Sequence, residues 1–379
     1  MAFIPKTEAD VAEIIKGTHQ PLHIQGGGTR PVGDPLAAET LSLAGLSDVR
    51  LYEPGALTIV AGAGTPLAEV EAALAAENQR LAFEPMDHRG LLGTTGTPTI
   101  GGVVAANVSG PRRVQNGAAR DFLLGVRFVD GTGEVLKNGG RVMKNVTGYD
   151  LVRLLAGSRG TLGAITEVAF KVLPAVDTVA TLKIAGLTSD RAIAALSHAL
   201  GSPYEVTGAA HAPAGPDGGP VTLIRLEGFA ASVAYRTGAL SAALDAYGAI
   251  SVETDPDAVV ALWTWVRDAE AFHGTDGDVW RISAKPTHGA EIANRLSGAR
   301  LVFDWGGGLV WAEVAQGQDV RVALAGVPGH ATLVRADDAT RTRLGTFEPE
   351  APAVARLSAG LRAKFDPRGI LNPGLMAAA

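Results

Sequence analysis

The sequence has 379 residues, which is enough for two domains of ordinary size. Hydrophobic residues make up 46% and charged residues 19%, as in a globular protein, and the net charge of −6 without a basic cluster argues against a nucleic acid partner. There is no cysteine, so disulfides, thiolate nucleophiles and cysteine-bound iron–sulfur clusters are excluded. We find neither a signal peptide nor a run of about 18 apolar residues and therefore expect a cytoplasmic protein.

The first pattern along the chain is a glycine-rich turn after a short predicted strand. The apolar segment Pro21–Gln25 predicts the strand, and Gly26-Gly27-Gly28-Thr29 follows it at once. The N–H groups of such a turn can converge on an anion, although a flexible surface turn explains the same residues. The spacing is not G-x-G-x-x-G, and Pro31, Gly33 and Pro35 interrupt any following helix, so we reject a Rossmann fold.

The second pattern is Pro98–Pro111, a segment of small residues without aromatic or large polar side chains. Its glycine pair Gly101-Gly102 allows other atoms to approach the main-chain N–H groups closely. Short hydrogen-bonding side chains follow at Asn107 and Ser109, and Gly110-Pro111 favours a turn. The segment suits a flat, phosphate-bearing cofactor lying along the chain. A small-residue helix packed in the core is the alternative.

A predicted hairpin and a third glycine-rich turn follow. The segment Val126–Leu136 predicts two strands joined by a turn at Asp130-Gly131-Thr132-Gly133. The third glycine-rich turn is Gly157–Gly163, and the alternating segment Ala164–Leu173 after it predicts a strand that Pro174 ends. We expect a first domain at residues 1–174.

Beyond this point glycine motifs become rare, and predicted strands and helices alternate as far as Ala336. Two strand–helix–strand–strand–helix–strand runs in series predict an antiparallel sheet with helices on one face. A helix at Val354–Lys364 and the tail Phe365–Gly374 close the sequence. We expect a second domain at residues 175–338 and a C-terminal segment, residues 339–379, that returns to the first domain.

The three glycine loops and the Asn-Pro-Gly tail together resemble the FAD-binding proteins of the vanillyl-alcohol oxidase, or PCMH-type, superfamily. The motifs that carry this resemblance are Ile24–Arg30, Thr99–Gly110, Gly157–Ile165 and Phe365–Gly374. Within the superfamily, Lys144–Leu151 with Gly160–Gly163 resembles the 2-hydroxy-acid dehydrogenase branch. Three further segments are similar to the family of FAD-binding E subunits of glycolate oxidases: Val108–Arg113, Asp304–Gly307 and Gly329–Leu333.

The resemblance implies an α+β fold. A PCMH-type FAD-binding domain made of two small α+β subdomains would carry an antiparallel-sheet, ferredoxin-like cap domain. The implied cofactor is FAD, held noncovalently because Thr29 rather than a histidine follows the first glycine loop, with His88 as the nearest alternative tether. The implied cofactor-binding residues are Gly26, Gly27, Gly28, Thr29, Thr99, Ile100, Gly101, Gly102, Asn107, Ser109, Gly110, Gly163, Ile165 and Asn372.

Oxidation of a 2-hydroxy acid requires a cation for the carboxylate, a base for the hydroxyl proton and a flavin that accepts hydride. We expect Arg281, on a predicted strand, to bind the carboxylate, with a structural or solvated arginine as the alternative. His330, beside Gly329, is the candidate base, although a loop histidine is often structural. Asp304 could orient either group or cap a turn. The eight histidines are scattered without metal-ligand spacing, so we expect no metal.

Two departures from the families that this sequence resembles bear on function. The paired histidines and the later Glu-His pair of catalytic relatives are absent, and Arg159 stands where those relatives carry an acidic residue. The first hypothesis is an FAD-binding subunit of a hetero-oligomeric glycolate dehydrogenase that forms glyoxylate. The alternative is a structural or electron-relay subunit, with a homologous D-type FAD subunit carrying the substrate chemistry. A free-standing oxidase is a third possibility.

The same resemblance implies two partner subunits. One is the D-type FAD subunit, and the other is an F-type iron–sulfur subunit that would collect electrons, because a chain without cysteine must pass them on. Contact with the inner membrane would then be indirect, through these partners.

Overall fold

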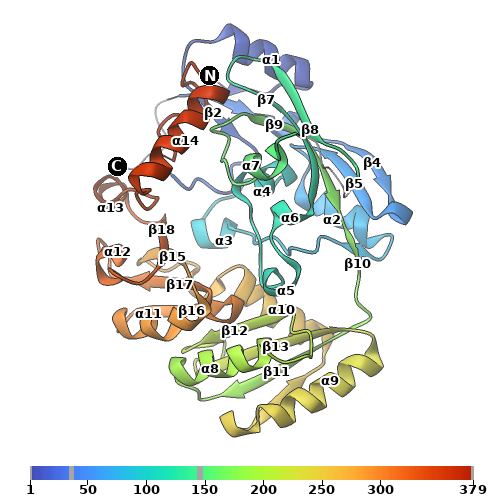
Figure 1. Ribbon diagram of the computed structural model, residues 1–379, viewed down its shortest axis with the longest axis vertical. Coiled ribbons are helices and arrows are strands. Elements are labelled where there is room, and N and C mark those ends of the chain that lie inside the picture. Colours follow the sequence, from blue (N-terminus) through green and yellow to red (C-terminus); the bar gives the residue numbers. More distant parts are fainter. Residues whose placement is uncertain (1, 34–37, 143–147, 377–379) are drawn as a thin grey trace.

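The computed structural model describes residues 2–33, 38–142 and 148–376 (Figure 1). Residues 144–147 of the Lys144–Leu151 motif lie outside the described residues. The α+β fold expected from the sequence is confirmed. Figure 1 shows one group of elements around β7 and β9 at the top and a second, larger sheet at the bottom, with α3 and α5 between them.

The upper group is built on a five-stranded antiparallel sheet of order β4-β5-β9-β7-β8. Its strands are β4 (Val49–Glu53), β5 (Thr58–Gly62), β7 (Leu123–Val129), β8 (Val135–Gly139) and β9 (Ala164–Lys171). The predicted hairpin is confirmed as β7 and β8, because the side chain of Asp130 accepts hydrogen bonds from the N–H groups of Thr132 and Glu134 and closes the turn. Beside this sheet a short antiparallel pair joins β6 (Gln79–Arg80) to β10 (Leu173–Pro174).

A smaller parallel sheet of order β1-β3-β2 forms the second part of the upper group. Its strands are β1 (Ala2–Phe3), β2 (Leu22–Gln25) and β3 (Glu39–Ser42). The outer edge of β2 is covered by the C-terminal tail, because Leu22 N–H donates to the Ile370 carbonyl at 2.7 Å and Asn372 N–H donates to the Leu22 carbonyl at 2.9 Å. The tail therefore belongs to the upper group, far from its neighbours in sequence.

Helices of the upper group are mostly short. They are α1 (Glu8–Gly17), α2 (Leu67–Ala75), α3 (Arg89–Leu92), α4 (Ile100–Ala106), α5 (Arg113–Asn116), α6 (Ala119–Phe122) and α7 (Leu151–Leu155). The small-residue segment Pro98–Pro111 thus contains the compact helix α4, which was the alternative interpretation of its sequence. In the C-terminal part, α13 (Asp338–Leu344) and α14 (Pro352–Phe365) lead back to the upper group (Figure 1).

The lower sheet has eight strands of order β14-β11-β13-β12-β16-β17-β15-β18. They are β11 (Thr178–Ala185), β12 (Gly208–Ala212), β13 (Val221–Gly228), β14 (Ile250–Glu253), β15 (Asp278–Ala284), β16 (Arg300–Asp304), β17 (Leu309–Val314) and β18 (Gly329–Arg335). Each set of four consecutive strands has the 4-1-3-2 order of a ferredoxin-like unit, as the two predicted runs suggested. The two units meet edge to edge at one bridge, His211 to Phe303.

Four helices cover the outer face of the lower sheet: α8 (Ser189–Leu200), α9 (Ala230–Ala243), α11 (Gly289–Arg295) and α12 (Val320–Ala323). The prediction of helices on one face is wrong for α10 (Pro256–Arg267). Trp263 of this helix packs on Ala210 and Leu223, whose sequence neighbours Ala209 and Ile224 point to the outer face. Both sides of these strands are apolar, and a short apolar strand does not reveal which side a helix covers.

The inner face of the lower sheet shares a hydrophobic core with the upper group. Phe83, Phe128 and Phe170 from above belong to the same cluster as Val302 and Trp311 from below. The two groups of elements therefore pack against each other through apolar side chains. No helix of the described residues is both long and apolar enough to cross a bilayer.

A buried ion-pair network also connects the two groups. Arg225 on β13 pairs with Glu84 at 2.9 Å, and Arg112 pairs with Glu227 at 2.7 Å. Arg80 approaches Glu227 at 3.4 Å. Although burial opposes ionisation, the neighbouring arginines Arg225 and Arg112 lower the pKa of Glu227 to about 2. Each buried arginine in this network faces a carboxylate.

Candidate functional site

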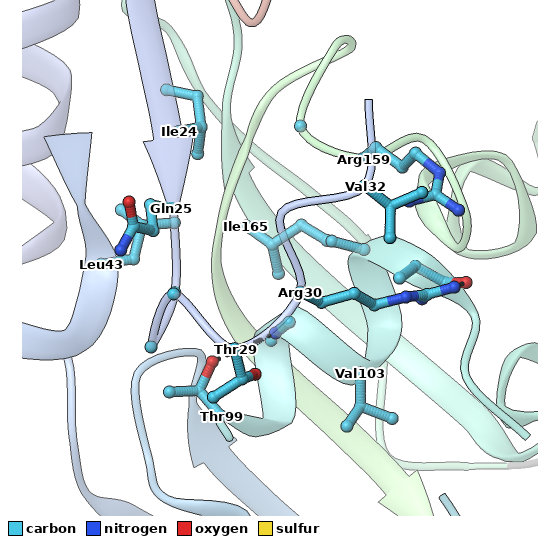
Figure 2. A pocket seen from close by; sticks show the side chains of 18 of the residues that line it. Ile24, Gln25, Thr29, Arg30, Val32, Leu43, Thr99, Val103, Arg159 and Ile165 are labelled. Atoms are coloured by element: carbon cyan, nitrogen blue, oxygen red, sulfur yellow. Dashed lines mark hydrogen bonds between the residues drawn. The ribbon is translucent and has the colours of Figure 1, made fainter. Parts of the chain in front are cut away.

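A cavity opens in the upper group where the three glycine loops meet (Figure 2). The loop after β2, helix α4, the segment at Arg159–Ile165 and the tail all contribute to its walls. Most residues predicted to bind the cofactor line it: Gly26, Gly27, Gly28, Thr29, Thr99, Gly101, Gly102, Gly163, Ile165 and Asn372. Four predicted residues do not line it: Ile100, Asn107, Ser109 and Gly110.

The first glycine loop presents main-chain donors to the cavity. The N–H groups of Gly26, Gly27, Gly28 and Thr29 have no hydrogen-bond acceptor among the described residues. The loop is held by its packing, because a Cβ on Gly27 would collide with the carbonyl of Thr97. Free N–H groups on a loop fixed in this way are the donors that a phosphate group requires.

The second glycine loop differs from the sequence-based expectation in how it uses its N–H groups. The first turn of α4 is closed within the protein: Ile100 N–H donates to Thr65 at 3.0 Å, and Gly101 N–H donates to Ala63 at 2.8 Å. Gly102 N–H donates to the Thr99 hydroxyl oxygen at 3.3 Å. This helix end therefore contributes its surface to the cavity rather than free donors.

Gly101 and Gly102 lack a side chain for different structural reasons. A Cβ on Gly101 would lie 2.5 Å from the Cβ of Ala63, so glycine is needed for α4 to pack beside β5. Gly102 is exposed and lines the cavity, and a Cβ there would meet only the Thr99 hydroxyl at 3.2 Å. The missing side chain at Gly102 thus leaves cavity space open.

Residues of this segment that lie outside the cavity support the structure around it. Asn107 ends α4 in the left-handed conformation, with φ +48°, and its side-chain oxygen accepts from Arg120 N–H at 3.1 Å. The Ser109 hydroxyl accepts from Ala119 N–H at 3.0 Å, and the Gly110 carbonyl accepts from the Trp305 indole at 3.0 Å. Their predicted contacts with FAD stay predictions.

The tail closes the cavity through Asn372. Its side-chain oxygen accepts from Ile24 N–H at 2.7 Å, and its amide donates to the Arg159 carbonyl at 2.7 Å. The hydrogen bond to the flavin ring expected for Asn372 stays a prediction, and these contacts already fasten β2 to the third glycine loop. In that loop, a Cβ on Gly163 would lie 2.6 Å from the ring of Phe128.

Three arginines with low exposure gather around His88. Arg30 and Arg159 line the cavity and reach the same side of it, on either side of Val32 (Figure 2). Burial lowers the pKa of Arg159 to about 10. Burial, then the charges of Arg159 and Arg281, lowers the pKa of Arg30 well below its usual range. Burial and then Arg30 lower the pKa of His88, which is therefore neutral at pH 7.

Arg281 lies on β15 and His330 on β18, the edge strand of the lower sheet. In the β15–β18 pairing Arg281 faces Thr332 and Ser283 faces His330, so the alternation of strand residues puts Arg281 and His330 on one face. Burial, then Arg113 and Arg159, lowers the pKa of Arg281 to about 10. Neither Arg281 nor His330 lines the cavity itself.

The environment of Arg281 also contains Trp305 and Asp304. The Arg281 guanidinium lies 5.2 Å from the centre of the Trp305 ring. Asp304 caps the turn by accepting from Trp305 N–H at 2.7 Å, and burial raises its pKa to about 7. No carboxylate of the described residues lies within 4.0 Å of Arg30, Arg159 or Arg281. In the same part of the chain, no group of three metal-ligating side chains is placed to hold an ion.

In the sequence, Arg159 stands out only as a departure from the families that this chain resembles, and Arg30 does not stand out as a site residue. Arg30 was visible at the end of the first glycine motif, but nothing in the sequence shows that it lies near Arg159 and Arg281. Their proximity comes from three segments that are far apart in the chain.

Comparison with known proteins agrees with this geometry. The sequence model of the FAD binding domain family matches residues 1–139. The glycolate oxidase subunit GlcE of Escherichia coli is 34% identical over 359 residues, which cover 94% of this chain and 92% of that protein. A D-lactate dehydrogenase of Archaeoglobus fulgidus is 31% identical over 186 residues, covering 48% of this chain and 40% of that protein.

Solved structures show the same fold at low identity. The 4-ethylphenol oxidase of Gulosibacter chungangensis has a TM-score of 0.72 and 15% identity, covering 99% of this chain and 88% of that one. An alkyldihydroxyacetonephosphate synthase has a TM-score of 0.69 and 18% identity, covering 98% of this chain and 76% of that one.

The residues around the cavity fit FAD. Unpaired N–H groups in the first loop suit its phosphates, and the open space at Gly102 suits close approach of a flat molecule. Family, fold and cavity thus agree on FAD as the cofactor. The chain belongs to the family of the glycolate oxidase subunit GlcE, within the PCMH-type FAD-binding superfamily, and is an FAD-dependent oxidoreductase.

Proposed function

We propose that the chain is the FAD-bearing subunit of a glycolate dehydrogenase complex, in which it oxidises glycolate or a similar small 2-hydroxy acid to the 2-oxo acid. Residues 1–174 and 339–379 would hold FAD, and residues 175–338 would supply the groups that bind substrate. The observation that carries the proposal is the position of Arg281, a cation of low exposure without a carboxylate partner among the described residues, on the same sheet face as His330.

Arg281 and His330 would divide the work on the substrate. The Arg281 guanidinium offers N–H donors to the substrate carboxylate, and its charge is retained at pH 7 because its pKa is about 10. Burial and then Arg281 lower the pKa of His330, so a neutral imidazole nitrogen is available to take the hydroxyl proton. When bound, FAD supplies the acceptor for the hydride that leaves the substrate Cα.

The cofactor is proposed to be noncovalent. Thr29 cannot form the histidine linkage, but His88 lines the cavity and is the side chain to test. Acid precipitation of the purified protein should leave yellow flavin in the supernatant. Flavin that stays in the protein pellet of the wild type but not of a His88→Ala variant would contradict this part of the proposal.

The proposal includes partner subunits, because the relative with 34% identity is named a subunit and this sequence has no cysteine for an iron–sulfur cluster. Electrons would pass to an F-type iron–sulfur subunit, beside a D-type FAD subunit.

A second candidate is an electron-relay or structural flavoprotein subunit, with the D-type subunit oxidising substrate. It is favoured by one observation: Arg281 and His330 do not line the cavity. Anaerobic addition of glycolate to the purified, FAD-loaded chain distinguishes the two. Loss of flavin absorbance near about 450 nm in the wild type and not in Arg281→Gln supports the first candidate. Unchanged absorbance in both proteins rejects it and favours the second.

A further inference from the structure

Arg30, Arg159 and Arg281 approach one another from both sides of the shared core. Arg30 follows the first glycine loop, Arg159 precedes the third, and Arg281 extends from β15 of the lower sheet. Arg30 and Arg159 both line the cavity, with Val32 between them in Figure 2. After burial, the charge of Arg281 contributes to the lowered pKa of Arg30, and the charge of Arg159 contributes to the lowered pKa of Arg281.

Elsewhere between the two groups of elements, the protein neutralises its arginines with carboxylates. Arg225 and Arg112 are paired with Glu84 and Glu227 at 2.9 Å and 2.7 Å. Around Arg30, Arg159 and Arg281 the described residues provide no such pair. The carboxyl group of Asp304 favours the charged form of Arg281. However, one of its oxygens accepts a hydrogen bond from Trp305 N–H, and burial raises the pKa of Asp304 to about 7.

The three guanidinium groups keep hydrogen-bonding capacity. The Arg159 guanidinium stacks on the Phe347 ring at 4.8 Å and that of Arg281 lies over Trp305 at 5.2 Å, so aromatic rings cover one flat face of each. Stacking leaves the N–H edge of a guanidinium available for a carboxylate. Arg30 Nε has no hydrogen-bond partner, and its Nη1 makes one contact of 3.5 Å, with the Ala106 carbonyl.

Arg30, Arg159 and Arg281 are half-buried, and like charges held together and partly shielded from water are costly unless an anion compensates them. We propose that Arg30, Arg159 and Arg281 together form a binding site for a small carboxylate anion, and that a compact dicarboxylate binds there more tightly than a monocarboxylate. Two carboxylates match three cations better than one does, and each carboxylate can accept from a guanidinium edge. The inference rests in part on the proposed function, which assigns Arg281 to the substrate carboxylate, but the two can be tested separately because an anion can bind without being oxidised.

The test uses the purified, FAD-loaded chain and two redox-inert probes, oxalate and acetate. Dissociation constants are measured by isothermal titration calorimetry and by the change in flavin absorbance. Oxalate should bind more tightly than acetate. Arg30→Gln and Arg159→Gln should each weaken oxalate binding by about tenfold or more and reduce the difference between the probes. Arg159→Lys should lose less, since it retains the charge.

A matched control is Arg153→Gln on α7, because Arg153 lies six residues from Arg159 in sequence and its side chain is 62% exposed. This variant should bind oxalate like the wild type. Bound FAD is quantified for every variant, which identifies any that fail to fold or to retain the cofactor.

Two results would overturn the inference. The first is wild-type oxalate affinity in FAD-loaded Arg30→Gln and Arg159→Gln. The second is loss of FAD from these variants while oxalate affinity per bound flavin stays unchanged, since the arginines would then serve the phosphates of FAD. Failure of the proposed function is distinguishable: tight oxalate binding without flavin reduction by glycolate rejects the proposed function and retains the anion site.

Discussion

The side-chain amide of Asn372 donates a hydrogen bond of 2.7 Å to the main-chain carbonyl of Arg159. Arg159 adopts a left-handed conformation with φ +52°, which is uncommon for a residue with a side chain. The C-terminal tail therefore helps to hold a cationic residue of the cavity in a conformation that its own backbone disfavours.

Replacing Asn372 by alanine should lower both stability and FAD retention. Ile24 N–H would lose its acceptor and the Arg159 carbonyl its donor, and a buried group left without a partner costs about 1–3 kcal/mol. Urea unfolding and flavin absorbance measure the two effects. Asn294→Ala on the exposed side of α11 is the control and should change neither. Wild-type stability and FAD content in Asn372→Ala would contradict this role of the tail.

Adjacent glycines of α4 should respond to alanine in different ways. Gly101→Ala places a Cβ against Ala63 and should lower the melting temperature of the protein without FAD. Gly102→Ala should leave that temperature unchanged or raise it, because alanine favours helix by up to about 1 kcal/mol. Its methyl group extends into the cavity, so FAD affinity should fall. Equal FAD affinities of Gly102→Ala and wild type would argue that FAD does not approach this turn.

His330 and Arg281 should be electrostatically coupled. Burial is the larger cause of the lowered pKa of His330, and the positive charge of Arg281 is the second. Arg281→Gln removes that charge and should raise the pKa of His330 part of the way toward its ordinary value of 6.5. Titration of the imidazole by NMR measures the change, with Arg153→Gln as control. A pKa of His330 that is the same with and without Arg281 would place the two side chains out of electrostatic contact.

Glu227 should make stability depend on pH. Its pKa falls from 4.5 to about 2 in the folded protein, so its contribution is fully present above pH 4.5 and is lost as pH falls toward 2. Glu227→Gln should lower the free energy of unfolding at pH 7 by about 1–3 kcal/mol, because Arg112 and Arg225 then share Glu84 alone and Arg80 loses its carboxylate partner. The difference in the free energy of unfolding between this variant and the wild type should become smaller below pH 4.5. Exposed Glu270→Gln is the control, and a difference independent of pH would contradict the assignment.

Local patterns in the sequence predicted much of the fold. The β7–β8 hairpin follows from alternating apolar residues and the Asp130 turn, and the two ferredoxin-like units follow from the order of strand and helix signals. The position of α10 could not be predicted, because the neighbouring residues Leu223 and Ile224 are both apolar and face opposite sides of β13. Only tertiary packing decides which side receives the helix.

The site was predicted unevenly for a related reason. The glycine-rich composition of Gly26–Thr29 is enough to predict a cofactor-binding loop, and these residues do line the cavity. The sequence could not show that N–H groups of Ile100 and Gly101 are already bonded to Thr65 and Ala63. Nor could it show the arginine cluster, whose members are brought together only by long-range folding.

The pairing of β2 with the tail has a consequence for biosynthesis. Asn372 contacts Ile24 across a sequence separation of 348 residues, so the strand that carries the first glycine loop lacks its outer neighbour while the chain is still emerging from the ribosome. The wall that Asn372 and Leu375 contribute to the cavity is added only when this tail has been released and has docked. A chain that stops before residue 370 would thus lack a wall of the cavity, and flavin uptake should then fail.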